Sequence, residues 1–332
     1  MNMLLKGLAA TAIAATLATP VLAETTEINF GIISTESQSN LKTIWDPFLA
    51  DMGKKTGLKI NAFFASDYAG VIEGMRFGKV QIAWVGNKAG MEAVDRANAE
   101  VFAQSVAVGG EPGYWGLLLA PADSALTSAE DVLKCDKSLN FGLGDPNSTS
   151  GYLVPMTFLF AQNGKDPKEC FKTVTNANHE TNAMAVVNKH VDVATNNTEN
   201  MMRLTKTNPE AAAKIKVIWK SPLIPSDPIV WNKELDQPTK DKLVAFFMGY
   251  GRQGTPEQVE AERGVLSGLQ WAPFRPSSDA QLYPIRIMEI TKAMFTLKGD
   301  DKISAEEKTA KLKELEAEKA KYDALLVKVP QA

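Results

Sequence analysis

Three consecutive hydroxyl residues, Ser148, Thr149 and Ser150, form the most chemically suggestive stretch of the 332-residue chain. A turn-forming Asp-Pro-Asn precedes them, and Gly151 and an apolar run follow, which is typical of the start of a helix. The first N–H groups of a helix have no partner within the helix and attract negative charge. One hydroxyl is enough for capping, so the run is compatible either with a helix cap alone or with a bound anion.

Three further side chains could join an anion site. His179, one of two histidines, stands at the start of a helix predicted over 179–190. A helix N-terminus disfavours a charged imidazolium, whereas a bound dianion would favour one. Tyr68 and Tyr114 are of a type that usually packs in a core, although their hydroxyls could donate to an anion in a cavity. By itself, His179 fits a capping or solvent-exposed side chain better than a ligand.

Two acids, Glu199 and Asp227, offer the opposite chemistry. Glu199 follows a predicted strand in the segment NNTEN, and Asp227 lies in a Pro-flanked turn in the segment IPSDPIVW. Residues in such places are usually caps or solvated turn residues. If both faced a cleft, their carboxylates would bind a cation.

Signatures of catalysis are missing from the sequence. It contains no G-x-x-x-x-G-K-[ST], H-E-x-x-H or G-x-S-x-G, and two histidines without a ligand cluster give little support for a metal. We therefore expect a binding protein, not an enzyme, without metal or cofactor. The net charge of −3 argues against nucleic acid as a partner, because phosphate contacts need clustered lysine and arginine.

Residues 1–23 are typical of a secretory signal peptide. Lys6 supplies the positive charge, residues 7–18 are small and apolar, and the segment ends in Val-Leu-Ala, which resembles a cleavage site. The apolar stretch is shorter than the ~20 residues that a membrane span needs. We expect export to the periplasm, with a retained membrane anchor as the alternative.

The two cysteines, Cys135 and Cys170, fit neither C-x-x-C spacing nor a zinc ligand set. In an oxidising compartment such a pair favours one disulfide, with two unpaired thiols as the alternative.

Strands that alternate with helices must position these residues. Strands are predicted at 27–34, 59–65, 80–86, 139–144, 191–197, 217–221 and 228–231. The hydroxyl run opens a helix predicted to end near residue 162. Such alternation indicates βαβ units and a largely parallel sheet. Because no low-complexity linker separates two autonomous units, we expect two α/β lobes with crossing connections.

The C-terminal tail, 304–328, is highly charged and predicted to be helical. Ser304 with Glu307 forms a capping-box pattern. A narrow seam repeats every three or four residues, at Leu312, Leu315, Lys319, Tyr322 and Leu326. The seam fits either a helix packed on its own lobe or a contact in a homodimer.

Nine segments of the chain together resemble the periplasmic phosphonate-binding proteins of ABC importers. They are NFGIISTESQSNL, NAFFASDYAG, AWVGN, MEAVDRAN, GDPNSTSG, NHETNAMAVVNK, VDVATNNTEN, VIWKSPLIPSDPIVW and WAPFR. The segments occur in the order of the family, and the resemblance as a whole extends from about residue 27 to 298. Val85 departs from the pattern, which has a tyrosine there, and the two cysteines are not part of the pattern.

The resemblance implies a two-lobed α/β Venus-flytrap fold with the ligand between the lobes. Lobe 1 would comprise residues 24–118 and 226–300, lobe 2 residues 119–225, and the helical tail residues 301–332. In the family, the phosphonate oxygens are held by residues that match Ser148, Thr149, Ser150, His179, Tyr68 and Tyr114. Two acids that match Glu199 and Asp227 hold the ammonium of 2-aminoethylphosphonate.

From this resemblance we expect a periplasmic binding protein that delivers an organophosphonate, 2-aminoethylphosphonate foremost, to a membrane permease. Three alternatives remain open at this point. The ligand could be phosphate, phosphite or an alkylphosphonate; the protein could be an exported phosphonate-processing enzyme; or it could serve a sensor instead of a permease.

Overall fold

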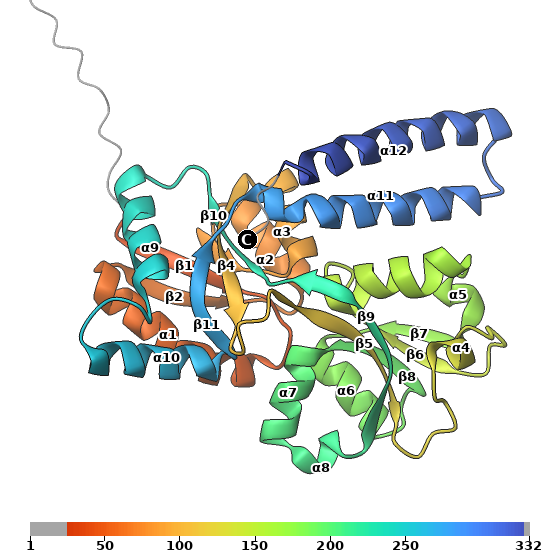
Figure 1. Cartoon of the computed structure of the whole chain (residues 1–332), viewed down its shortest axis with the longest axis horizontal. Helices are drawn as coiled ribbons and strands as arrows, with labels where there is room; N and C mark the ends of the chain where they lie inside the picture. The colour runs from red at the N-terminus through yellow and green to blue at the C-terminus, as the bar shows by residue number, and fades with distance from the viewer. Residues whose placement is uncertain (1–24, 329–332) are drawn as a thin grey trace, which may run out of the picture.

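Two β-sheets form the framework of residues 25–328, the part of the chain that the computed structural model describes. The predicted signal peptide lies outside these residues. The described part of the chain forms two lobes, one around each sheet (Figure 1). Within the described residues, no helix is long and apolar enough to cross a membrane.

The first lobe is built on a six-stranded sheet in the order β11-β4-β10-β3-β1-β2. Its strands are β1 (Glu27–Ile32), β2 (Lys59–Phe64), β3 (Ile82–Trp84), β4 (Ala99–Ala107), β10 (Pro228–Asn232) and β11 (Trp271–Pro276). Its helices are α1 (Gln38–Thr56), α2 (Tyr68–Arg76), α3 (Asn87–Arg96), α9 (Gln237–Gly249) and α10 (Pro256–Gly268).

The second lobe is built on a five-stranded sheet in the order β7-β6-β8-β5-β9. Its strands are β5 (Gly113–Pro121), β6 (Asn140–Leu143), β7 (Thr173–Asn176), β8 (Val193–Asn197) and β9 (Ile215–Pro225). Its α-helices are α4 (Ala129–Val132), α5 (Pro167–Cys170), α6 (His179–Val187), α7 (Thr198–Thr207) and α8 (Pro209–Ala212). The helix predicted after the hydroxyl run is wound mainly as two π-helical segments, η1 (Thr149–Leu153) and η2 (Pro155–Phe160), followed by a short 3-10 turn.

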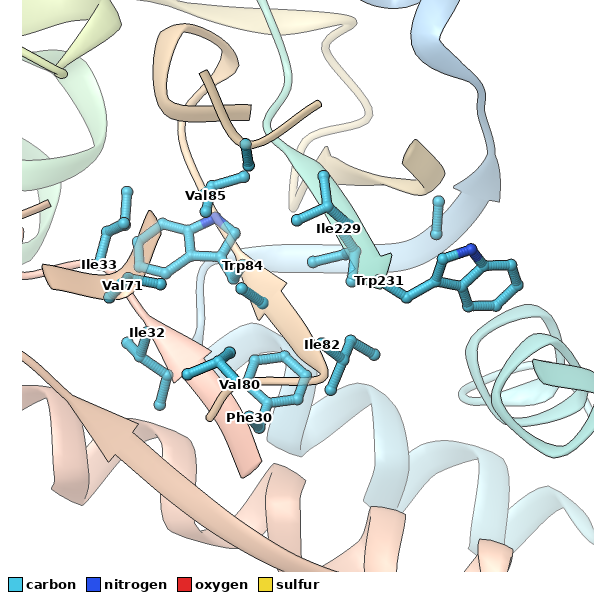
Figure 2. Packing of buried hydrophobic residues seen from close by; sticks show 14 of the residues in the cluster. Phe30, Ile32, Ile33, Val71, Val80, Ile82, Trp84, Val85, Ile229 and Trp231 are labelled. Carbon is cyan, nitrogen blue, oxygen red and sulfur yellow. The ribbon is translucent and has the colours of Figure 1, made fainter. Parts of the chain in front are cut away.

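Aromatic packing holds α1 against the first sheet. Its buried residues recur every three or four positions, which puts Trp45 and Phe48 on one face of the helix. The Trp45 ring lies 5.3 Å from Phe30 and 5.4 Å from Trp84, measured between ring centroids. Figure 2 shows this core around Trp84, where β3 pairs with β10 and Trp84 lies opposite Ile229 in the antiparallel register.

The chain crosses between the two sheets twice, from β4 to β5 and from β9 to β10. The crossing strands run antiparallel to their neighbours, so both sheets are mixed and the prediction of a largely parallel sheet is wrong. The physical reason is that a chain returning directly from the other lobe enters the sheet in the reverse direction. At the first crossing, a side chain on Gly113 would collide with the carbonyl of Ile224, so the two connections approach as closely as glycine allows.

The second lobe is also linked covalently, because Cys135 and Cys170 form a disulfide. The two cysteines lie beside the buried rings of Phe141, Phe160 and Phe171, which form the core of this lobe with them.

Two C-terminal helices, α11 (Tyr283–Lys298) and α12 (Ala305–Leu326), form a hairpin that projects from the lobes (Figure 1). Ser304 accepts a hydrogen bond from the Glu307 N–H and so caps α12, at the residue predicted from the sequence. Tyr322 of the predicted seam lies against Tyr283 of α11, with 5.8 Å between ring centroids. The seam therefore packs on this chain, although no residue of α12 is fully buried.

Candidate ligand-binding site

A polar cavity lies between the two lobes and is lined by residues of both. The lining residues include all eight that the sequence suggested, namely Tyr68, Tyr114, Ser148, Thr149, Ser150, His179, Glu199 and Asp227. The other residues of the lining are Thr35, Glu36, Trp45, Trp84, Gly86, Asn197, Asn200, Arg203 and Trp271, together with Ile33, Ile44 and Leu269. Segments separated by more than a hundred residues therefore converge on one site.

The hydroxyl run stands at the end of β6, where the chain turns into η1. Ser148 Oγ caps this segment by accepting a hydrogen bond from the Gly151 N–H at 3.0 Å. A Cβ on residue 151 would lie 2.9 Å from Ser148 Oγ, so glycine leaves room for the cap. Capping and ligand binding are thus compatible at this residue.

Each of the three hydroxyl oxygens accepts a hydrogen bond from an N–H. Besides the cap on Ser148, Thr149 Oγ1 accepts from the Lys88 backbone N–H of the other lobe at 2.8 Å. Ser150 Oγ accepts from Asn197 Nδ2 at 3.1 Å. A hydroxyl has one hydrogen to donate, and these three contacts use none of the hydrogens. Ser150 Oγ also lies 3.4 Å from His179 Nε2, a longer contact that competes with an anion for its hydrogen. The run can therefore present three donors to an anion.

His179 opens α6 and is buried beside this run. Its Nε2 lies 3.4 Å from Ser150 Oγ and 3.2 Å from Asn197 Nδ2. Burial, and secondarily the nearby Arg203 guanidinium, lower the pKa of His179 to about 4. The imidazole is therefore neutral at physiological pH unless a bound anion raises its pKa.

The two tyrosines of the cavity have different partners. Tyr68 opens α2 and is buried, and its backbone N–H donates to Asp145 Oδ2 across the lobes at 3.2 Å. Burial first, and then the charge of Asp145, raise the pKa of Tyr68 well above its usual value, so its hydroxyl stays protonated. The Tyr114 hydroxyl donates to Asp227 Oδ1 at 3.1 Å. In this arrangement its hydrogen is bonded to a carboxylate and is not available to an anion.

The two acids lie close to each other in a poorly hydrated place. Asp227 is buried in the second crossing, and Glu199 is partly buried in the first turn of α7. Burial is the largest cause that raises the pKa of both carboxyls, and the charge of Glu199 raises that of Asp227 further. Arg203 lowers the pKa of Glu199 only in part. A positive group between the two carboxylates would relieve both effects.

Trp84 interacts with one of these acids, Asp227. Its indole N–H favours the charged form of Asp227, yet it makes no hydrogen bond of ordinary geometry with any described residue. The Trp84 ring thus forms part of the cavity wall, and its indole N–H remains available to another acceptor.

Sequence reasoning missed a cross-lobe ion pair at the cavity. Glu36, in the loop after β1, lies 2.9 Å from Arg203 Nε on α7, and both side chains are largely buried. A second carboxylate joins the lobes from the other side. Glu180 of the second lobe accepts two hydrogen bonds from the first lobe, at Oε2 from the Ser37 N–H (2.6 Å) and at Oε1 from Asn40 Nδ2 (2.7 Å). The position of Glu36 just after a strand was the one available signal, since ligand sites in α/β sheets gather at strand ends.

Polar atoms without partners gather in this cavity. Among the described residues, the buried atoms Thr35 Oγ1, Trp84 Nε1, His179 Nδ1 and Asn200 Oδ1 have no hydrogen-bond partner, and all four residues line the cavity. More than 90% of buried polar groups in native proteins are paired, so a cluster of unpaired ones marks a place where a polar ligand completes the bonding.

Comparisons with known proteins point to one family. Residues 30–282 match the family model described as the periplasmic phosphonate substrate-binding protein of an ABC transporter. The chain is 56% identical over 312 residues to the phosphonates-binding periplasmic protein of Escherichia coli K12, covering 93% of this chain and 90% of that protein.

Solved structures share the fold. A binding protein component of a phosphonate ABC transporter from Pseudomonas aeruginosa matches with a TM-score of 0.87 and 56% identity, over 92% of this chain and 99% of that one. A Prochlorococcus marinus protein solved with methylphosphonate matches with a TM-score of 0.70 and 19% identity, over 79% of this chain and 97% of that one, and this likeness concerns the fold alone. The family predicted from the sequence is confirmed, as are the two-lobed α/β fold and a binding role in place of an enzymatic one: the chain belongs to the periplasmic phosphonate-binding proteins of ABC transporters.

Proposed function

We propose that this protein binds 2-aminoethylphosphonate and delivers it to the membrane permease of an ABC importer. The observation that carries the proposal is the pairing of two opposite chemistries in one small cavity. Hydroxyl donors and a neutral histidine form one side, and two carboxylates form the other. We call these the anion side (Tyr68, Ser148, Thr149, Ser150 and His179) and the cation side (Glu199 and Asp227).

The separation of the two sides suits a short zwitterion. A Cβ built on Gly86 would lie 3.3 Å from Thr149 Oγ1 on the anion side and 4.0 Å from Asp227 Oδ1 on the cation side. Both sides thus border the same glycine, and a side chain here would fill the space between them. A phosphonate and an ammonium joined by two carbon atoms could contact both sides at once.

The anion side would hold the phosphonate by oriented neutral donors. Donors fixed in a cavity that excludes water stabilise an anion without a full counter-charge, because they need no reorganisation when it binds. The cation side would hold the ammonium by charge-assisted hydrogen bonds, which are about twice as strong as neutral ones.

The role proposed for Tyr114 differs from the expectation drawn from the family. Its hydroxyl has one hydrogen and donates it to Asp227. We propose that Tyr114 orients this carboxylate toward the ammonium and contributes little to binding of the phosphonate.

Phosphate, phosphite and alkylphosphonates are the competing ligands. Each is an anion without a positive group, so each would leave the buried pair of Glu199 and Asp227 uncompensated. The cation side therefore favours an aminophosphonate over all three.

Isothermal titration calorimetry on the mature protein, refolded to remove any bound ligand, tests the proposal. The matched ligands are 2-aminoethylphosphonate and ethylphosphonate, which lacks only the amine, with methylphosphonate and phosphate added for the competing ligands. We expect the aminophosphonate to bind at least ~100-fold more tightly than ethylphosphonate, the factor that two charge-assisted contacts supply. Equal or tighter binding of ethylphosphonate or phosphate would refute the ligand assignment.

Two further proposals concern assembly. We propose that the boundaries of the lobes lie in the two crossings, at 108–112 and 226–227, because β5 belongs to the second sheet from Gly113 onward. The first of these boundaries is earlier in the chain than the expected boundary at residue 118.

The predicted homodimer stays a proposal, in which the outer face of α12 would contact a second copy of the chain. Sedimentation of the full mature chain and of a chain ending at residue 300 would test it, since only the full chain should dimerise.

A further inference from the structure

Asn197 connects the anion side to α7 and has no assigned role. It is the last residue of β8 and the N-cap of α7, and it is buried. Its Oδ1 accepts a hydrogen bond from the Asn200 N–H at 2.7 Å. This bond fixes the orientation of the amide, because only the oxygen can accept, and Nδ2 must then point away from the helix.

The Nδ2 group has two hydrogens and two neighbours. It lies 3.1 Å from Ser150 Oγ and 3.2 Å from His179 Nε2. An amide nitrogen is only a donor, so the neighbouring Nε2 must be the acceptor. A neutral imidazole whose Nε2 accepts carries its proton on Nδ1.

We propose that Asn197 is a positioning residue that holds neutral His179 in the Nδ1–H tautomer and aims the Ser150 hydroxyl hydrogen at the anion. Ser150 can then donate its hydrogen to the phosphonate, and the Nδ1–H of His179 becomes a second donor without a protein partner in a residue that lines the same cavity. His179 Nδ1 is buried and has no partner among the described residues, which is the state expected of a donor reserved for a ligand. The low pKa of His179, caused first by burial, keeps the ring neutral so that a tautomer is defined.

The proposal rests on the proposed function only for the identity of the anion. The tautomer is a property of the protein itself and is measured without phosphonate. Failure of the wild-type protein to bind any phosphonate would therefore remove the proposed function and leave the tautomer measurement valid.

Nitrogen-15 NMR of the mature protein labelled at histidine tests the tautomer directly. The chain has two histidines, and His190 is exposed and serves as the internal reference. We expect a protonated Nδ1 and an unprotonated Nε2 for His179 at neutral pH. A protonated Nε2 on His179 would overturn the proposal.

Asn197→Asp is the sharpest variant, because aspartate is an equally good N-cap but replaces the Nδ2 donor by an acceptor. We expect His179 to change to the Nε2–H form and the affinity for both aminoethylphosphonate and ethylphosphonate to fall by roughly 100-fold or more, since a buried carboxylate would face the anion. Unchanged His179 nitrogen shifts in this variant would overturn the role of Asn197.

Asn208→Asp is the matched control. Asn208 is the exposed N-cap of α8, and its Oδ1 accepts from the Ala211 N–H at 3.1 Å. The same substitution there should leave affinity and the His179 spectrum unchanged. If Asn197→Asp does not fold, as judged by circular dichroism, Asn197→Ser keeps a capping oxygen without the amide donor. Retention of the Nδ1–H form in that variant would equally refute the proposal.

Discussion

In the proposed function, the two sides of the cavity stabilise a buried charged ligand in different ways. On the anion side, Ser148, Thr149 and Ser150 are neutral, and each already accepts one N–H, so little free energy is lost when the side is desolvated. On the cation side, Glu199 and Asp227 are charged groups whose burial raises their pKa values. The anion side is thus preorganised for any phosphonate, whereas the cation side is destabilised until a positive group arrives.

The comparison teaches that affinity and selectivity can reside in different residues. Changes on the anion side should affect every phosphonate to the same degree. Changes on the cation side should affect only ligands with an amine. Four experiments test this division.

Asp227→Asn should have the largest effect. The substitution removes one of two buried carboxylates, so the affinity for 2-aminoethylphosphonate should fall by ~100-fold or more, in line with the ~3–5 kcal/mol lost when a buried charge pair is broken. The affinity for ethylphosphonate should stay the same or rise. Calorimetry with both ligands measures the ratio, and an equal loss for the two ligands would contradict the division.

The pH dependence of binding should separate the two sides next. Because burial raises the pKa values of Asp227 and Glu199, these acids take up protons above the usual pH range of carboxyls. An ammonium favours their ionised forms, so its binding releases protons, and the affinity for the aminophosphonate falls as the pH drops through the raised pKa values.

The loss should approach tenfold per pH unit for each proton released. The ammonium lowers the second phosphonate pKa of the aminophosphonate relative to that of ethylphosphonate, so each affinity is first corrected for the measured ionisation of its free ligand. The corrected ratio of aminoethylphosphonate to ethylphosphonate affinity then isolates the acids. A ratio that does not change between pH 8 and pH 5 would show that the acids do not contact the amine. In Asp227→Asn the dependence of this ratio on pH should weaken.

Thr149→Val tests the anion side. Valine matches threonine in shape but lacks the hydroxyl, and it also leaves the Lys88 N–H without its acceptor. We expect a loss of roughly tenfold for aminoethylphosphonate and for ethylphosphonate alike, the effect of one lost hydrogen bond to a charged group. A loss confined to the aminophosphonate would show that Thr149 acts on the ammonium end of the ligand and not on the phosphonate.

Tyr114→Phe should have the smallest effect and is the sharpest test of how Tyr114 is used. If its hydroxyl orients Asp227, as the 3.1 Å contact indicates, the affinity for the aminophosphonate should fall by about 3–10-fold, and that for ethylphosphonate should not change. Equal losses for both ligands would show that Tyr114 donates to the phosphonate, as expected from the family. The melting temperature of each variant serves as the control for folding.

The fold could be read from the sequence where periodic patterns are local. Buried residues of α1 recur every three or four positions, and Ser304 and Glu307 mark the start of α12, so these elements were predictable. The strand directions were not, because antiparallel pairing of β10 with β3 and β4 depends on where the chain returns from the other lobe. The π-helical winding after Ser148 likewise has no signal in the local pattern.

The candidate site shows the same limit. The residue types that suggest an anion and a cation site are visible in the chain, and the family resemblance connects them. Glu36 and Arg203 were missed because nothing in the local pattern marks them as partners: their pairing joins the loop after β1 in one lobe to α7 in the other. Asn197 was missed because an asparagine before a helix is an ordinary cap until a histidine is placed beside it.

The sequence by itself determined the alternation of strands and helices, the helix cap at Ser148 and the supply of donors and acids, because these depend on neighbours within a few residues. Only the tertiary structure decided that Lys88 meets Thr149, that Tyr114 serves Asp227 and that Asn197 faces His179. The first contact joins the two lobes, the second joins β5 to the second crossing, and the third joins β8 to α6 within the second lobe. Burial then sets the protonation of the side chains, and burial is a property of the folded whole.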